Sequence, residues 1–315
     1  MPANLPPQYF EAEKRFRFAK TPKEKISILH EMLAIMPKHK GTDKLQADLR
    51  AKISKLNKLS QKTHIKSRRD SLYYVNKEGA GQVVILGEPN AGKSQILTVL
   101  THANPEVASY PFTTHKPIVG MLNFEDIAIQ LIDTSPITSD FCEHWLLNIS
   151  RTADLLLFLV DLSGDVVDQI ETIIKKLSEA KVFFENRVLI VGNKNDLNGS
   201  EEKFCILTDR YAEKFPVISV SAKEKKRLSE LKRKIYDGLN IIRVYTKVPG
   251  KPPDKNVPFV LKRETTVLDA ARTVHKDFGT NLRFARLWGA GKYDGQRVER
   301  DHILRDGDVV EFHIS

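Results

Sequence analysis

Residues 87–94 read GEPNAGKS, and this stretch decides the fold of the central part of the chain. It follows an apolar run at residues 83–86 and opens a predicted helix over residues 93–101. A strand, a GxxxxGKS loop and a helix in this order form a P-loop, in which backbone N–H groups bind phosphate oxygens. Lys93 is then expected to pair with the β- and γ-phosphates, and the Ser94 hydroxyl to ligate Mg²⁺. The predicted ligand-binding residues of this loop are Gly87, Pro89, Asn90, Ala91, Gly92, Lys93 and Ser94.

Residues 76–246 continue this alternation of strands and helices. Further apolar runs bounded by turn residues predict strands at 127–132, 155–160, 188–191 and 217–220, with helices over 166–180 and 225–239. Strands that alternate with helices favour an α/β domain with a mostly parallel sheet. The P-loop is therefore expected to lie at the carboxyl edge of that sheet.

Two later segments predict which base is bound. Residues 193–196 read NKND and follow one predicted strand, and residues 221–223 read SAK and follow the next. Loops at the carboxyl ends of parallel strands meet at one crevice. The Asp196 carboxylate can accept hydrogen bonds from the guanine N1–H and amino groups, which adenine lacks, so such a site rejects ATP by roughly 10⁴-fold. The predicted guanine-binding residues are Asn193, Lys194, Asp196, Ser221, Ala222 and Lys223.

Two segments between these motifs are candidates for switch loops, which contact the nucleotide and Mg²⁺. Residues 110–114 read YPFTT and lie in the loop after the first predicted helix of this domain. Thr113 and Thr114 are candidate nucleotide-binding residues there. Asp133 directly follows the 127–132 strand and is the carboxylate expected near Mg²⁺. The predicted metal ligands are Ser94, Thr114 and Asp133.

Residues 1–75 form a basic helical segment, predicted to be a helical hairpin. They contain 17 Lys/Arg and 7 Asp/Glu, so they carry the chain's entire net charge of +10. Pro22 suits the first position of a helix that should run to about Pro37, and a second helix has an apolar stripe at Leu45, Leu49, Ile53 and Leu56. Such concentrated charge predicts a polyanionic partner, namely the ribosome or structured RNA. A lysine-rich helix face that only contacts water is the alternative.

The C-terminal part is predicted to be a separate domain. Residues 247–256 contain three prolines within KVPGKPP and are predicted to be a linker. Residues 257–315 then form a small unit with both strand and helix signals. Three segments are therefore expected, with boundaries near residues 75 and 246.

Composition excludes several classes of protein. The longest purely apolar stretch is far shorter than the roughly 20 residues of a membrane span, and the N-terminus lacks the apolar core of a secretory signal. Two isolated cysteines indicate reduced thiols without a disulfide framework. A cytoplasmic protein with no membrane and no DNA partner is expected.

These motifs together resemble a known family. YPFTT, the RTAD stretch before LLLFLVD, and NKxD are similar to the Obg superfamily of GTPases. The basic N-terminal segment and the C-terminal unit narrow the resemblance to the developmentally regulated GTP-binding protein (DRG) branch, with a β-grasp TGS domain at residues 257–315. The resemblance implies a ribosome- or RNA-associated GTPase in which Thr114 is a Mg²⁺ ligand. The sequence leaves open whether a companion protein is required.

The chain departs from the DRG pattern in two places. Only 60 residues separate Asp133 from Asn193, so the inserted domain of that branch is predicted to be absent. The fourth position of the DxxG motif is Pro136. In the family, the glycine at this position donates its N–H to the γ-phosphate, and proline has no N–H to donate.

Asn90 is a candidate for a K⁺-dependent role, because potassium-dependent GTPases have an asparagine at this P-loop position. There K⁺ stabilises the charge that develops in the transition state. The alternative is that Asn90 only suits a tight turn. Two functions follow: a slow GTPase with Lys93, Thr114 and Asn90 as its catalytic residues, or a guanine-nucleotide-dependent scaffold with little hydrolysis. Pro136 favours the scaffold, and the otherwise complete motif set favours the enzyme.

Overall fold

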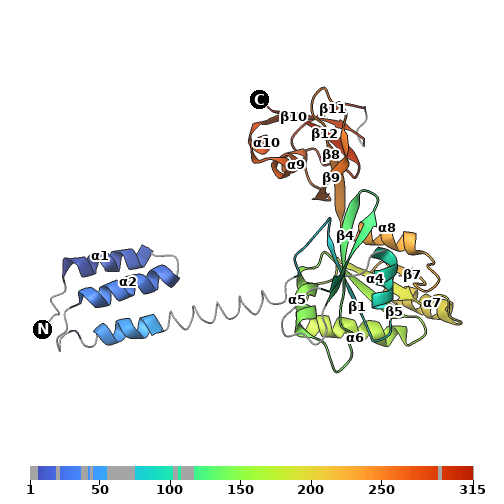
Figure 1. Cartoon of the computed structure of the whole chain (residues 1–315), viewed down its shortest axis with the longest axis horizontal. Helices are drawn as coiled ribbons and strands as arrows, with labels where there is room; N and C mark the ends of the chain where they lie inside the picture. Colours follow the sequence, from blue (N-terminus) through green and yellow to red (C-terminus); the bar gives the residue numbers. More distant parts are fainter. Residues whose placement is uncertain are drawn as a thin grey trace. The chain divides into compact units, whose positions relative to one another are not determined.

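A computed structural model describes residues 6–18, 22–36, 42, 45–54, 75–101, 106–107, 117–289 and 293–314. The chain divides into two compact units, Met1–Tyr74 and Val75–Ser315, which are described separately below. Figure 1 shows the chain, with most of its helices and strands labelled.

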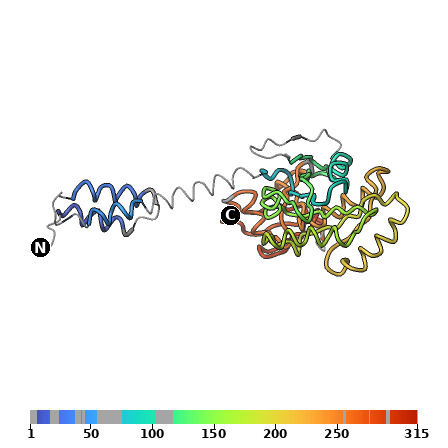
Figure 2. Tube along the Cα trace, turned by 90° about the horizontal axis from the view of Figure 1, so that it is seen from below, coloured from blue at the N-terminus to red at the C-terminus, as the bar shows by residue number. Residues whose placement is uncertain are grey.

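The described residues of the N-terminal unit form three helices (Figure 2). They are α1 (Pro7–Phe18), α2 (Pro22–Ile35) and a helix over residues 45–54. The sequence pattern predicts a hairpin of two helices; α1 is an additional helix, in which charged residues interrupt the apolar ones. All three helices pack around one small apolar core, which contains Tyr9, Ala12, Leu29, Met32, Met36, Leu49 and Ile53. The basic side chains of Lys14, Arg50 and Lys52 remain exposed.

A seven-stranded sheet, in the order β2-β3-β4-β1-β5-β6-β7, forms the centre of the second unit. Five of its strands are parallel: β4 (Ile127–Asp133), β1 (Gln82–Gly87), β5 (Leu155–Asp161), β6 (Val188–Asn193) and β7 (Val217–Ser219). The prediction of an α/β domain with a mostly parallel sheet is confirmed. Two antiparallel strands, β2 (Glu106–Val107) and β3 (Ile118–Phe124), extend one edge. The strand β3 is not among the predicted strands, because Gly120 and Asn123 interrupt its apolar run.

Helices cover this sheet (Figure 1). The helices α4 (Lys93–Thr101) and α8 (Leu228–Gly238) pack into one apolar cluster with alternate residues of the strands, such as Val83 and Ile85. The intervening residues, such as Val84 and Leu86, are equally buried, because the other face is covered too. There α6 (Val166–Glu179) packs against β1 and β5. The remaining helices are α5 (His144–Thr152) and α7 (Ser200–Tyr211).

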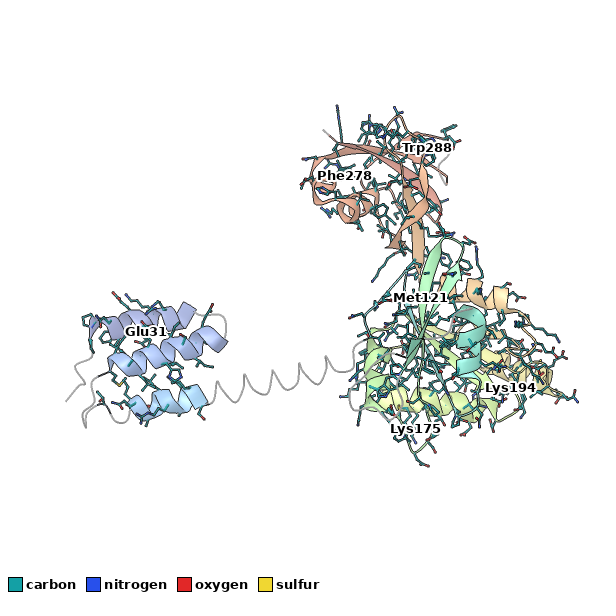
Figure 3. The ribbon with its side chains drawn as sticks, in the orientation of Figure 1. Glu31, Met121, Lys175, Lys194, Phe278 and Trp288 are labelled. Carbon is teal, nitrogen blue, oxygen red and sulfur yellow. The ribbon has the colours of Figure 1, made fainter. Side chains whose placement is uncertain are left out.

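A second sheet, in the order β11-β10-β12-β8-β9, forms the C-terminal domain. Its strands are β8 (Ile241–Thr246), β9 (Asp254–Lys262), β10 (Leu282–Trp288), β11 (Gln296–Val298) and β12 (Asp308–Ile314), and its helices are α9 (Val267–Val274) and α10 (Lys276–Asn281). The strand β12 pairs in parallel with β8 and antiparallel with β10. This arrangement of a mixed sheet with a packed helix is the expected β-grasp. Trp288 lies on β10 (Figure 3). The Lys247 ammonium lies 4.4 Å from the centre of its ring.

The predicted domain boundary differs from the structure. The predicted boundary near residue 246 places residues 241–246 in the GTPase domain. In the structure these residues form β8, which pairs with β9 and β12, and Ile242 and Val244 belong to the C-terminal core. Of the segment predicted as a linker, residues 247–253 instead join β8 to β9 as a hairpin connection, and residues 254–256 belong to β9. In this connection Gly250 has φ +79° and the Lys251 N–H donates to the Val248 carbonyl. Prolines stop strands equally well between two domains and within one hairpin.

Candidate functional site

The predicted nucleotide motifs converge at the carboxyl edge of the seven-stranded sheet. β1 ends at Gly87, β4 at Asp133 and β6 at Asn193, and these strands are parallel, with β1 next to β4 and β5 between β1 and β6. Parallel strands bring their carboxyl ends together, which is where α/β proteins bind ligands. Thr113 and Thr114 of the YPFTT segment lie outside the described residues, so their predicted roles stay predictions.

The P-loop has a backbone that its sequence makes possible. Asn90 has φ +63° and Gly92 has φ +94°, a region that glycine and asparagine tolerate best. A Cβ atom on residue 92 would lie 2.4 Å from the Asn193 Nδ2 atom, so only glycine fits there. The Lys93 ammonium donates to the carbonyls of Gly87 (3.1 Å) and Glu88 (2.8 Å), which holds it across the mouth of the loop. Burial lowers the pKa of Lys93, and the nearby Asp133 carboxylate opposes that shift.

Ser94 and Asp133 form the candidate Mg²⁺ site. The Ser94 hydroxyl donates to the Asp133 Oδ2 atom at 2.5 Å, and the buried Oδ1 atom has no hydrogen-bond partner among the residues that the structure describes. Burial raises the pKa of Asp133, and the hydroxyl of Ser94 and the ammonium of Lys93 counteract this. Hydroxyl and carboxylate oxygens are the ligands that Mg²⁺ takes in nucleotide sites. The unpaired, buried oxygen therefore fits a divalent cation.

Asn193 joins the P-loop to the base-binding loops. Its side chain is 1% exposed, its Nδ2 atom donates to the Ala91 carbonyl (2.9 Å), and its Oδ1 atom accepts from the Ala222 N–H (3.1 Å). One amide thus bridges the phosphate-binding loop and the SAK loop. It fixes the distance between the two parts of the site that would hold phosphate and guanine.

Asp196 is held as an ionised acceptor. The Ser221 hydroxyl donates to its Oδ1 atom at 2.5 Å, and the Glu224 N–H donates to that hydroxyl at 3.0 Å. The Ser221 hydrogen bond lowers the pKa of Asp196. Guanine recognition requires a carboxylate at this position, because it accepts hydrogen bonds from two N–H groups of the base. Helix α8 begins three residues later than predicted, because Lys225 and Arg227 have positive φ in the loop that follows Lys223.

Asp161 belongs to the site and was not among the predicted residues. It ends β5, and its Oδ2 atom lies 2.5 Å from the Lys194 ammonium, which is labelled in Figure 3. Gln169 fixes Asp161 with two hydrogen bonds to its backbone, of 2.8 Å and 3.0 Å. The sequence contains one signal for this role, since Asp161 is the first charged residue after the apolar run of a central strand.

Fold and site together define a P-loop GTP-binding protein. The protein-family model described as "50S ribosome-binding GTPase" matches residues 82–194, and the model of the TGS domain matches residues 242–314. The TGS match begins inside β8, in agreement with the structural boundary. A solved GTP-binding protein from Pyrococcus horikoshii has the same fold, with a TM-score of 0.52, 18% identity, and coverage of 74% of this chain and 100% of that one.

Curated relatives extend over nearly the whole chain. A GTP-binding protein of Methanocaldococcus jannaschii is 30% identical, with 93% of each chain covered. The developmentally-regulated GTP-binding protein 2 homologue of Dictyostelium discoideum is 27% identical over 91% of this chain and 98% of its own, and the mouse protein 2 is 25% identical with the same coverage. The chain belongs to the developmentally regulated GTP-binding protein family of the Obg superfamily.

The alignment with the archaeal relative spans 365 residues, more than the 315 of this chain. The relative therefore contains residues without a counterpart here. Between β4 and β6 this chain has only α5, β5 and α6. Both observations agree with the predicted absence of an inserted domain.

Proposed function

We propose that this protein hydrolyses GTP slowly and acts as a nucleotide-controlled switch on the ribosome or on structured RNA. The observation that carries the proposal is the Asn193 bridge, which connects a phosphate-binding loop and a guanine-binding loop in one site. None of the described helices is long and apolar enough to cross a membrane. We expect the protein to work in the cytoplasm.

Each part of the site has a separate role in hydrolysis. Lys93 and the P-loop N–H groups bind the phosphates and stabilise the charge that develops on them. Ser94, Asp133 and Thr114 would hold Mg²⁺, which neutralises phosphate charge when it is bound. Asp196 and the SAK loop orient the guanine base, so that the γ-phosphate is presented in one position.

Asn90 is the candidate for a K⁺ requirement. Its φ of +63° agrees with the alternative hypothesis, in which asparagine is present only because it suits a tight turn. A bound K⁺ would additionally use its side-chain oxygen. Comparing GTP turnover in K⁺ and in Na⁺ distinguishes K⁺ binding from a purely structural role, because a structural role of Asn90 predicts equal rates.

A scaffold with little hydrolysis is the second candidate, and Pro136 favours it. The next N–H along the chain, that of Ile137, donates to the Gly87 carbonyl at 3.1 Å. Neither residue 136 nor residue 137 therefore supplies a backbone donor to the γ-phosphate in this arrangement. Slow or absent turnover with intact GTP binding is the behaviour that this predicts.

Turnover of GTP by the full chain with Mg²⁺ tests the enzymatic proposal. We expect hydrolysis that disappears in Lys93→Ala and persists in Lys175→Ala, a matched control because Lys175 is an exposed lysine of α6. Tight GTP binding without turnover in either salt would support the scaffold instead. Equal turnover by Lys93→Ala would exclude the proposed catalytic site.

The RNA proposal rests on charge. The N-terminal unit carries the net charge of the chain. Apolar side chains from its three helices pack in its own core, whereas basic side chains such as Lys14, Arg50 and Lys52 lie on the surface. Deleting residues 1–70 should abolish salt-sensitive cosedimentation with ribosomes. Reversing these three charges in the full chain should weaken it while leaving GTP binding intact. Cosedimentation that survives both changes would refute a role for this unit. Cosedimentation that requires added cell extract would indicate a companion protein.

A further inference from the structure

The segment after β4 leaves the γ-phosphate without its usual backbone donor. Residues 133–136 read DTSP, so the residue that carries the donor N–H in related proteins is Pro136. The Ile137 N–H is engaged by the Gly87 carbonyl. If the protein contacts the γ-phosphate from this side, a group other than these two must do so.

Ser135, directly before Pro136, has a hydroxyl. Its side chain is 6% exposed, and its Oγ atom is buried without a hydrogen-bond partner anywhere in the described ranges. Only three side-chain atoms in those ranges share this property, and two of them belong to Ser135 and Asp133. Burying a hydroxyl without a partner is unfavourable, so such an atom calls for a ligand or another explanation.

The backbone on both sides of Ser135 is held against the P-loop. Before it, Asp133 accepts a hydrogen bond from Ser94 at the start of α4. After it, Ile137 donates to Gly87 at the first residue of the loop. Ser135 therefore lies on a short segment that runs along the phosphate-binding loop and is fixed to it at both ends.

Thr134 cannot take this role. Its hydroxyl donates to the Ile85 carbonyl at 2.7 Å, which ties its side chain to β1. Ser135 is thus the hydroxyl in this segment that remains without a protein partner in the part of the chain that the structure describes.

We propose that the Ser135 hydroxyl donates a hydrogen bond to the γ-phosphate and so replaces the N–H that Pro136 lacks. The protein would read the presence of the γ-phosphate through a side chain at this loop. The proposal rests on guanine-nucleotide binding and is independent of hydrolysis. A hydrogen bond from a hydroxyl to a phosphate oxygen is charge-assisted and therefore stronger than a neutral one.

The test compares the affinities of the full chain for GDP and for guanosine 5′-(β,γ-imido)triphosphate, measured by calorimetry with Mg²⁺. Ser135→Ala should weaken binding of the triphosphate analogue by about 10- to 100-fold, the worth of a hydrogen bond to a charged group, and leave GDP affinity unchanged. Ser150→Ala is the matched control, because Ser150 is also buried but donates to the Leu146 carbonyl. It should change neither affinity.

Two further measurements keep the proposal open to refutation. Pro136→Gly restores a backbone N–H, so the effect of Ser135→Ala should shrink in that background. The nucleotide-free Ser135→Ala protein should melt no lower than the wild type, because its hydroxyl has no hydrogen bond to lose. Unchanged affinities, equal weakening of both nucleotides, or a lower melting temperature would overturn the proposal. A wild-type protein that binds neither nucleotide would overturn the nucleotide site itself.

Discussion

Arg243 offers a quantitative test of how the nucleotide-binding domain and the C-terminal domain are joined. Its guanidinium lies on β8, is 11% exposed, and pairs with Asp126 at 2.8 Å, with Asp306 at 2.8 Å and with Glu125. Glu125 and Asp126 form the turn between β3 and β4, and the hydroxyl of Tyr245 also donates to Asp126. One arginine therefore connects a hairpin of the first domain to two segments of the second.

Arg243→Ala should lower the free energy of unfolding by about 2–3 kcal/mol. Removing one partner of a buried ion pair costs about 3–5 kcal/mol because the other charges stay buried and unpaired. The Glu125 and Asp306 carboxylates are 50% and 33% exposed, so water compensates part of this loss and reduces the expected cost to about 2–3 kcal/mol.

Urea denaturation measures this difference, and the chain contains its own control. Arg233 also pairs with Glu125, at 3.6 Å, but it is 59% exposed. Arg233→Ala should therefore cost less than about 1 kcal/mol. Trp145 and Trp288 report on the two domains separately, and Arg243→Ala should separate their transitions. If Arg243→Ala costs no more than Arg233→Ala, the reasoning is wrong.

Three further predictions concern pH, base specificity and the bridge between the loops. Burial would raise the pKa of Asp306, but hydrogen bonds from Arg243 and Tyr236 outweigh it and lower the pKa to about 2, from an ordinary value of 3.8. The ionised Asp306 carboxylate therefore stabilises the folded state above pH 3.8, and this contribution is lost as the pH falls through 2. Because the side chain is partly exposed, the contribution amounts to about 1–2 kcal/mol. In acid denaturation, Asp306→Asn should be less stable than wild type at pH 5, with the gap closing toward pH 2, and a constant gap would contradict the assignment. Asp196→Asn should shift preference from guanine to xanthine nucleotides in competition binding, and unchanged GTP affinity would disprove the base assignment. Asn193→Ala should weaken GDP and GTP by a similar factor, about 10-fold or more in fluorescent-nucleotide titrations, since both lost hydrogen bonds are independent of the γ-phosphate; a selective loss of GTP would contradict the bridging role.

The sequence by itself determined the nucleotide site, because its motifs are local. A GxxxxGKS loop between a strand and a helix has one backbone geometry, and the positive φ of Asn90 and Gly92 follows from it. NKND and SAK could be placed at the same crevice because parallel strands bring their carboxyl ends together. Long apolar runs such as residues 155–160 also predicted their strands correctly.

Only the tertiary structure decided which segments pair across long distances. β8 has an ordinary strand sequence, and its assignment to the C-terminal sheet depends on hydrogen bonds with β12, more than 60 residues away. The contacts of Arg243 join residues that are 63 to 118 positions apart. The burial of the Ser135 hydroxyl likewise depends on how its segment lies along the P-loop. Sequence patterns report the period of one element and the chemistry of one loop, whereas partners, burial and domain boundaries are set by packing between elements.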